Sequence, residues 1–300
     1  MIDAHLFKYR GFSMNYRHAF HAGNFADVIK HTILARCLEH LKVKPAPFRV
    51  IDTHAGIGRY DLAGARAERT GEWRAGIGRL LDAKLPSDVI ALIQPYLEAI
   101  HATRAVHGPS FYPGSPEIAR YLTRGEDRLI LIEKHPEDRA TLARNMAFDG
   151  RAKIIEIDAW VGLNAFVPPK ERRGLVLIDP PFEEPEEFEQ LLESFSQAYR
   201  KWPTGTYALW YPLKDLSAVA NFTWALRDLQ IPKMINVEFR IKAPTRTPSL
   251  FGCGMIIINP PWRLMDELSR ILPAYSELLA LDEGVGWNCD WLTEPVVTSI

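Results

Sequence analysis

The residues with the clearest chemical potential are Asp179, Pro180, Pro181 and Phe182, which follow the apolar run at 175–178. A short apolar run bounded by a glycine and two prolines is typical of a buried parallel strand that continues into a loop. The carboxylate and the neighbouring proline carbonyl are acceptors for an amine whose lone pair is delocalised into an aromatic ring. Phe182 offers a flat base a stacking surface. An isolated motif of this kind fits a plain proline turn equally well, so the rest of the chain must decide.

Apolar runs alternate with helical stretches along the chain, which predicts an α/β fold with a mostly parallel, doubly wound sheet. We expect seven strands, at Phe48 to Asp52, Leu129 to Glu133, Ile154 to Asp158, Leu175 to Asp179, Tyr207 to Tyr211, Ile235 to Ile241 and Met255 to Asn259. Each of the first four ends in an acidic residue. Ligands of such sheets bind at the carboxyl ends of the strands, so the four acids should converge on one pocket.

A glycine turn follows the first strand at 52–58 and would let a ligand approach the backbone at Gly56. The next strand places Glu133 where it can accept hydrogen bonds from both hydroxyls of a ribose, and the third places Asp158 where an adenine amine can donate. This order indicates an S-adenosylmethionine pocket followed by an amine-methylating loop. A nicotinamide site would require G-x-G-x-x-G directly before a helix, which this chain lacks.

About fifty residues separate the glycine turn from the next helix start, where Ser115 before Pro116 resembles an N-cap. We therefore interpret residues 60–111 as an insertion of short helices. Its Arg66 and Arg69 suit an electropositive lid over a nucleic acid, although a purely structural cap fits as well.

Ahead of the sheet, Asn24 and Asp27 resemble a capping pair that opens a helix. The segment around this helix start gathers aromatic rings and hydrogen-bond donors, which suits a stacked base and phosphates. Its members are Tyr16, Arg17, His18, Phe20, His21, Lys30 and His31.

The charge of the chain is uneven. The net charge is −1, yet the first eighty residues hold thirteen Lys and Arg against seven Asp and Glu. Such an excess attracts polyanions, although a solvated helical face explains it equally well.

Other bulk features restrict the class. The three cysteines are too scattered for a disulfide framework, which favours the cytoplasm, and no Cys or His pair has zinc spacing, so we expect no metal. No apolar stretch reaches the roughly 20 residues of a membrane span, so we expect no membrane association.

Several long motifs, taken together, closely resemble the RlmJ family of 23S ribosomal RNA adenine-N6 methyltransferases. They are NYRHAFHAGNFADVIKHT, DTHAGIGRYDL, AERTGEW, FYPGSPEIAR, RRGLVLIDPPFE, GTYALWYP and GMIIINPPW. The resemblance implies one Rossmann-like methyltransferase domain over residues 1–300 with a small helical insertion. It begins near Asn15, so residues 1–13 read as an extra N-terminal segment. It also implies 23S ribosomal RNA as partner, S-adenosylhomocysteine as product and a cytoplasmic protein, and it implies no oligomeric partner, so we expect a monomer.

The resemblance and the residue chemistry together give a set of candidate site residues. For catalysis these are Asp179, Pro180 and Phe182; for the cofactor His31, His54, Gly56, Ser115, Glu133, Asp158 and Ala159; and for the substrate Tyr16, Arg17, Lys30, Arg66 and Arg69. Two residues depart from the family pattern, which often has tyrosine at Phe182 and usually glycine at Ala159. Neither change removes a proposed acid.

Other functions stay open at this stage. Loops of the same pattern serve adenine methylation in DNA and glutamine methylation in proteins, and a non-catalytic nucleic-acid binder linked to the use of external DNA is a further alternative.

A second loop, Asn259 to Trp262, also satisfies the amine-methylating pattern. The strand before it follows its predecessor after only a short link, too short for the helical crossover between parallel neighbours. We therefore expect that last strand to run antiparallel, which places Asn259 at the far end of the sheet, and we expect Trp262 to pack.

Overall fold

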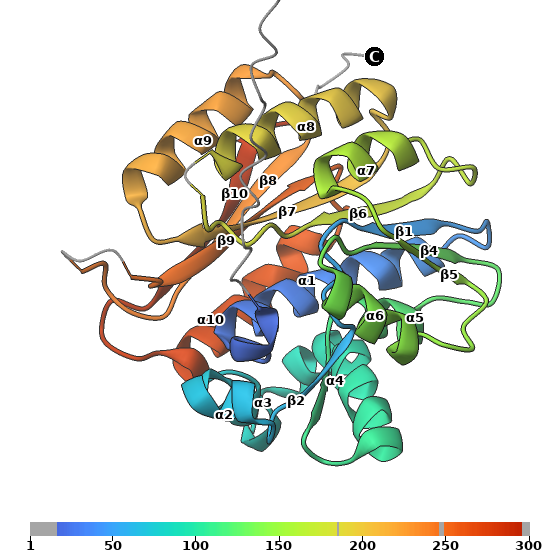
Figure 1. Ribbon diagram of the computed structural model, residues 1–300. Helices are drawn as coiled ribbons and strands as arrows, with labels where there is room; N and C mark the ends of the chain where they lie inside the picture. Colours follow the sequence, from blue (N-terminus) through green and yellow to red (C-terminus); the bar gives the residue numbers. More distant parts are fainter. Residues whose placement is uncertain (1–16, 185, 246–248, 296–300) are drawn as a thin grey trace, which may run out of the picture.

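All seven apolar runs form strands of one sheet, and an eighth strand joins them. The computed structural model describes residues 17–184, 186–245 and 249–295. Within them the strand order is β10-β8-β9-β7-β6-β1-β4-β5 (Figure 1). The strands are β1 (Arg49–Asp52), β4 (Arg128–Ile132), β5 (Ala152–Ile155), β6 (Gly174–Ile178), β7 (Thr206–Leu213), β8 (Met234–Arg240), β9 (Gly252–Ile258) and β10 (Gly286–Thr293).

The pairing confirms the mostly parallel sheet. Strands β5, β4, β1, β6 and β7 pair in parallel, whereas β9 is antiparallel to both β7 and β8. The predicted strand number was wrong, because β10 adds an antiparallel edge next to β8. This strand is amphipathic and mostly solvent-facing, so it carries no apolar run that the sequence could reveal.

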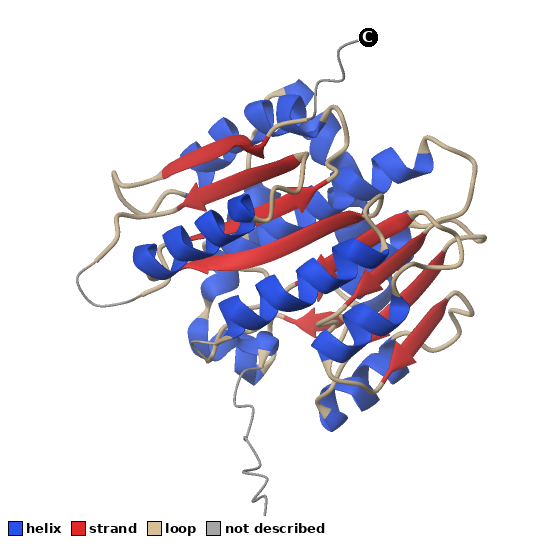
Figure 2. Cartoon of the chain, turned by 90° about the horizontal axis from the view of Figure 1, so that it is seen from above, coloured by secondary structure: helices blue, strands red, loops and turns tan. Residues whose placement is uncertain are grey.

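Helices cover both faces of the sheet, as a doubly wound fold requires (Figures 1 and 2). One face packs on α1 (Phe25–Lys42), α4 (Ser87–His107), α5 (Ser115–Leu122), α6 (Pro136–Asn145) and α10 (Leu264–Leu279). The other packs on α7 (Ala159–Phe166), α8 (Glu187–Lys201) and α9 (Leu216–Asp228). Among the described helices, none combines the length and apolarity that crossing a bilayer demands.

Helix α1 begins where the capping pair predicts. Asn24 is its N-cap, and the side chain accepts a hydrogen bond from the backbone N–H of Asp27 at 3.1 Å. The helix is buried on nearly every side, including Lys30 and His31, because the sheet, α4, α5 and α10 surround it. A charged side chain on such a helix needs a buried partner.

Between β1 and α5 the chain leaves the sheet. The strands β2 (Arg59–Asp61) and β3 (Phe111–Pro113) pair antiparallel at the base of this region, and the proposed insertion boundaries fall within them. Between them lie α2 (Ala65–Thr70), η2 (Glu72–Arg74), α3 (Ile77–Asp82) and α4. The sequence suggested only short helices, but α4 is one helix of 21 residues that continues through Pro95. The proposed extra segment, residues 1–13, lies outside the described residues.

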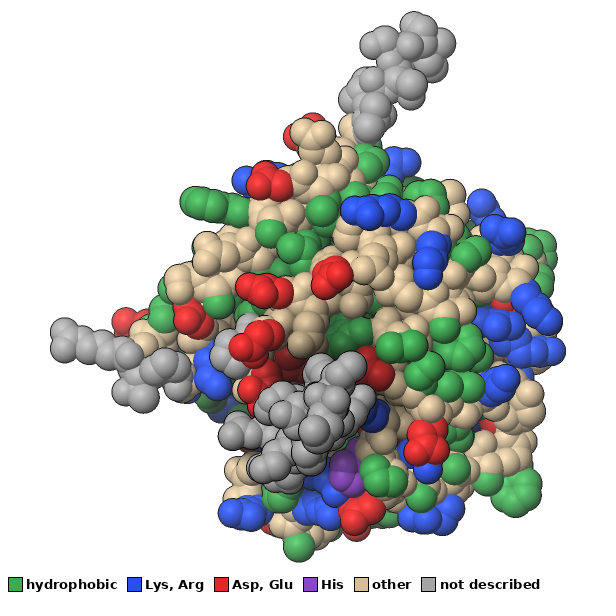
Figure 3. Space-filling view, turned by 45° about the horizontal axis from the view of Figure 1, so that its top comes forward, with side chains coloured by type: hydrophobic (Ala, Val, Ile, Leu, Met, Phe, Trp, Pro, Cys, Tyr) green, Lys and Arg blue, Asp and Glu red, His purple; other side chains and the backbone are tan. Residues whose placement is uncertain are grey.

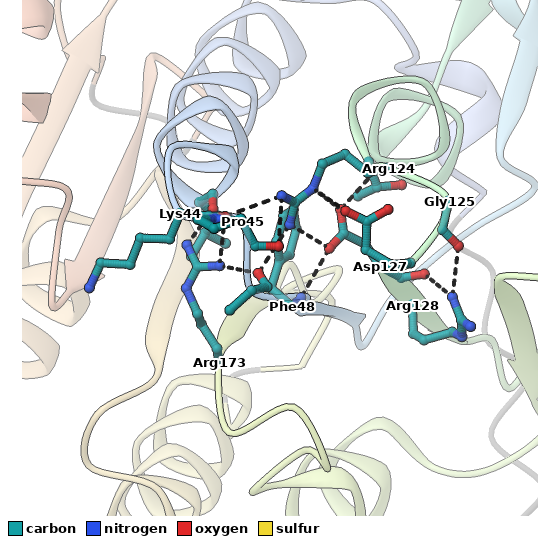
Figure 4. Close-up of polar contacts among 12 residues, drawn as sticks. Lys44, Pro45, Phe48, Arg124, Gly125, Asp127, Arg128 and Arg173 are labelled. Carbon is teal, nitrogen blue, oxygen red and sulfur yellow. Dashed lines mark hydrogen bonds and ion pairs between the residues drawn. The ribbon is translucent and has the colours of Figure 1, made fainter.

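A buried carboxylate fixes the starts of the central strands, at the end of the sheet away from the strand acids (Figure 4). Asp127 is fully buried and accepts hydrogen bonds from the backbone N–H of Phe48 and from the Arg124 side chain, each at 3.0 Å. The guanidinium groups of Arg124 and Arg173 lie 5.5 and 5.8 Å from the centre of the Phe48 ring. Both arginines also donate to carbonyls of the segment before β1. This cluster holds the entry to β1 in place.

Candidate active site

A cavity of about 600 Å³ lies where the predicted acids converge, at the carboxyl ends of the parallel strands. It is lined by every residue that we proposed for the cofactor: His31, His54, Gly56, Ser115, Glu133, Asp158 and Ala159. Asp179 and Lys30 line it too. The structure thus brings together residues that lie up to about 150 positions apart in the chain.

The glycine turn and Glu133 form one wall of this cavity. Gly56 has a φ of +59°, and a Cβ there would lie 2.4 Å from the Tyr60 hydroxyl, so the turn requires glycine. The Glu133 carboxylate accepts the backbone N–H of Gly56 at 2.9 Å and that of His135 at 2.7 Å. Burial nevertheless raises the pKa of Glu133 to about 7. An acceptor held in this way is oriented for two adjacent hydroxyl donors.

Ser115 lies beside a second buried acid. The expectation that Ser115 is an N-cap was wrong: Gly114 is the N-cap, and Ser115 is the first helical residue. Its side chain instead hydrogen-bonds Asp52 at the end of β1. Burial raises the pKa of Asp52 to about 6, although that hydrogen bond opposes the rise. The serine is thus oriented by the sheet rather than by its own helix.

Asp158 lies after the third strand rather than at its end. Strand β5 ends at Ile155, and Asp158 is the N-cap of α7, where one oxygen accepts the Trp160 N–H at 3.0 Å. The other oxygen lies 3.0 Å from the Lys134 ammonium. His54 contacts the Trp160 ring edge-to-face, with 5.5 Å between ring centres. Together these groups line the part of the cavity between β4 and α7.

Asp179 is paired with a buried lysine. The Lys30 ammonium donates to Asp179 Oδ2, and it lies 2.9 Å from Asp27 Oδ1. Burial by itself favours the neutral amine, but the charges of Asp179 and Asp27 raise the pKa of Lys30 well above its ordinary value. The other oxygen of Asp179 accepts no hydrogen bond from a described residue. A carboxylate so arranged keeps one free acceptor facing the cavity.

Asp27 joins this pair to His18. Its Oδ2 lies 3.0 Å from His18 Nε2 and accepts the Gly23 N–H at 2.8 Å. Burial opposes its charge, yet His18 and Lys30 lower the pKa of Asp27 well below its usual range. The sequence showed Asp27 only as a capping residue, and its i, i+3 spacing to Lys30 was the signal for this further role.

His31 is more deeply placed than the other candidates. Its Nδ1 lies 2.7 Å from the Tyr112 hydroxyl, which in turn lies 2.8 Å from the Tyr96 hydroxyl. Burial lowers the pKa of His31 to about 3, so the ring is neutral at physiological pH. This histidine can donate or accept at the cavity floor without adding charge.

A second cavity of about 380 Å³ adjoins the first and shares Asp179, Pro181, Lys30 and His18 with it. Its other lining includes Pro180, Phe182, Trp210, Pro212, Leu250 and Lys214. The rings of Phe182 and Trp210 lie 5.9 Å apart between centres, so one wall is aromatic. The sequence placed Trp210 in the expected strand Tyr207 to Tyr211 but indicated no role for it in the site. Nothing in the spacing connects β7 with the loop after β6.

Several arginines of the proposed basic surface are paired with acids. Arg17 pairs with Glu137 and Asp138 on α6, and two further N-terminal arginines, Arg36 and Arg49, pair with acids more than 100 residues away. These three arginines are therefore not free to contribute unpaired charge to the expected basic surface.

The remaining candidate substrate residues are Tyr16, Arg66 and Arg69. Arg66 and Arg69 are exposed on α2, and the Arg69 guanidinium lies 5.7 Å from the centre of the Phe20 ring. Neither lines either cavity, so their contact with RNA stays a prediction. Tyr16 lies outside the described residues. No group of three or more His, Cys, Asp or Glu in the described ranges is arranged to hold a metal ion.

The second amine-type loop lies at the other end of the sheet, as predicted. Ile258, the last residue of β9, pairs with Tyr207 near the start of β7. The Asn259 amide donates to the carbonyls of Pro203 and Gly205 at 2.9 and 2.8 Å, so it closes the turn before β7. The expected packing of Trp262 was wrong: its side chain is 77% exposed, and it is contacted by Arg263.

Comparison with known sequences agrees with this geometry. The family described as "Ribosomal RNA large subunit methyltransferase D, RlmJ" matches residues 45–293. The chain belongs to this family. Two similar proteins are both named ribosomal RNA large subunit methyltransferase J. The one from Haemophilus influenzae is 37% identical over 93% of this chain and 99% of its own, and the one from Escherichia coli is 38% identical over 91% and 98%.

A solved structure has the same fold over most of the chain. The crystal structure of a protein from Legionella pneumophila superimposes with a TM-score of 0.81 at 33% identity, over 90% of this chain and 98% of that one. The family membership confirms the resemblance that the motifs indicated.

Proposed function

We propose that this protein transfers a methyl group from S-adenosylmethionine to the N6 amine of an adenine in 23S ribosomal RNA. The family and the names of both relatives support the enzyme class and the RNA substrate. The observation that carries the proposal is the meeting of two cavities at Asp179, one suited to the methyl donor and the other to a base.

The larger cavity fits the donor, which when bound supplies a methyl group on a positively charged sulfur. Glu133 offers an acceptor to the two ribose hydroxyls, because its backbone partners already fix the orientation of both carboxylate oxygens. Asp158 offers an acceptor to the adenine amine of the donor. Gly56 and Ser115 complete the walls, and neutral His31 and His54 supply polar contacts without repelling a cationic ligand.

The smaller cavity fits the target base. Phe182 and Trp210 give its ring an aromatic wall, and the free oxygen of Asp179 and the Pro180 carbonyl accept from its amine. Holding both amine protons favours a pyramidal nitrogen, which restores the lone pair for attack. Lys30 orients this carboxylate: its ammonium occupies the other oxygen of Asp179, and Asp27 holds the ammonium in place.

Several finer expectations belong to the same proposal. The product is S-adenosylhomocysteine, the reaction requires no metal, and the protein works as a monomer. Because the proposed substrate is ribosomal RNA, we place the reaction in the cytoplasm.

The test is transfer of label from methyl-tritiated S-adenosylmethionine to separate pools of unmodified 23S RNA, DNA and protein. We expect label only in RNA, recovered as N6-methyladenosine by mass spectrometry after nuclease digestion, and none with Asp179→Ala. Label in DNA or protein would refute the RNA assignment. Failure to bind the donor in calorimetry would favour a non-catalytic nucleic-acid binder.

A further inference from the structure

The basic side chains around the smaller cavity, which we call the base cavity, differ in whether an acid already contacts them. Of the four that line it, His18 lies 3.0 Å from Asp27, His21 lies 3.0 Å from Glu72, and Lys30 is held by Asp27 and Asp179. Lys214 is the exception. Its side chain is exposed, and no acid in the described ranges lies within ion-pairing distance.

The fold fixes where Lys214 lies. Strand β7 ends at Leu213, and its alternation places Trp210, Pro212 and Lys214 on one face, where all three line the base cavity. The next residue, Asp215, does not neutralise Lys214. Its Oδ1 caps α9 by accepting the Ser217 N–H at 2.8 Å and the Ser217 hydroxyl at 2.6 Å. The ammonium is thus left available to an anion from outside the chain.

The loop after β6 makes another part of the rim acidic. Glu183 lines the base cavity, and Glu184, Glu186 and Glu187 line the adjoining donor cavity. These four glutamates come from the loop after β6 and the start of α8, and none of them has an ion-pair partner among the described residues. Acidic side chains gather beside the hollow in the space-filling view (Figure 3). A polyanion approaching these glutamates would be repelled, whereas Lys214 at the end of β7 would attract it.

We propose that Lys214 binds a backbone phosphate next to the target nucleoside, so that the RNA strand leaves the base cavity past the end of β7 and away from the glutamates at 183–187. This inference rests on the proposed function and adds to it the path by which the RNA strand leaves the base cavity. A phosphate contact positions the strand without reading its sequence, because the backbone carries the same charge beside every base.

The experiment compares Lys214→Ala with wild type in binding to a labelled 23S RNA transcript at 50 to 200 mM KCl. The matched control is Lys153→Ala, which removes an exposed lysine of β5, at the far edge of the sheet, that has no ion-pair partner among the described residues. We expect Lys214→Ala to weaken binding about three- to tenfold and to reduce the slope of log affinity against log salt by about one. Lys153→Ala should change neither. Glu183→Gln, which removes a negative charge from the lining of the base cavity, should tighten RNA binding.

Catalytic and ligand measurements separate this role from others. With Lys214→Ala, KM for RNA should rise while kcat and the affinity for S-adenosylhomocysteine stay within about twofold of wild type. An unchanged KM and an unchanged salt slope in a variant that still methylates RNA would overturn the phosphate contact and leave the proposed function intact. Absence of RNA methylation by the wild-type protein would instead count against the proposed function.

Discussion

The pH dependence of donor binding should report on Glu133. Because burial raises the pKa of this carboxyl to about 7, half of the free protein carries it protonated near neutral pH. Only the carboxylate can accept from both ribose hydroxyls while keeping its two backbone partners. Binding should therefore weaken tenfold for each pH unit below 7, which amounts to about 30-fold, or about 2 kcal/mol, between pH 8 and pH 5.5.

Calorimetry with S-adenosylhomocysteine measures this directly. We expect the affinity to fall along that curve, and titrations in buffers of different ionisation enthalpy should show release of nearly one proton per ligand at pH 6. Glu133→Gln should bind more weakly by about 1 to 3 kcal/mol at pH 8 and should lose most of the pH dependence. Asp158→Asn is the matched control, because the pKa of Asp158 is lowered by Lys134 despite burial, and it should keep the wild-type pH profile.

The pH dependence of the stability of the free protein tests the raised pKa values independently. The pKa of Glu133 and that of Asp52 are both higher in the folded protein than in an unfolded chain, so the folded state binds more protons between about pH 4 and pH 7. These groups therefore stabilise the fold at low pH and lose that contribution as pH rises through 6 to 7.

A flat donor affinity between pH 8 and 5.5, with no proton release, would refute the assignment of Glu133 to the ribose.

Three further predictions concern single residues. Asp179→Ala should lower kcat by more than 100-fold in a methyl-transfer assay and leave donor affinity within about tenfold, because in the proposed function its free oxygen accepts from the substrate amine. Retention of most turnover would contradict this role. Asn259→Ala should keep methylation within several-fold of wild type while thermal unfolding shows a loss of about 1 to 2 kcal/mol from its two carbonyl contacts; a folded but inactive variant would reverse the choice between the two loops. Asp127→Ala should cost about 2 to 4 kcal/mol in denaturant unfolding, because Phe48 N–H and the Arg124 guanidinium lose a buried acceptor, and a near-neutral result would show that water replaces it.

Local signals in the sequence determined the framework of the site. Apolar runs of strand length revealed seven strands, since a buried strand needs a continuous stretch of apolar side chains. The acids that follow the first, second and fourth runs lie at the carboxyl ends of β1, β4 and β6, because parallel strands share that edge. The short link before the last apolar run predicted its antiparallel direction, and so removed Asn259 from the site.

The tertiary structure alone decided which groups face one another. Lys30 contacts Asp179 across 149 positions of sequence, and Arg17 contacts Glu137 across 120, and no spacing pattern contains such pairs. The first pair places a charge inside the site, and the second removes one from the expected basic surface. The base cavity arises in the same way, because Phe182 and Trp210 meet only when β6 and β7 lie side by side. Sequence fixes which side chains are available, whereas long-range packing decides which charges remain free for a ligand.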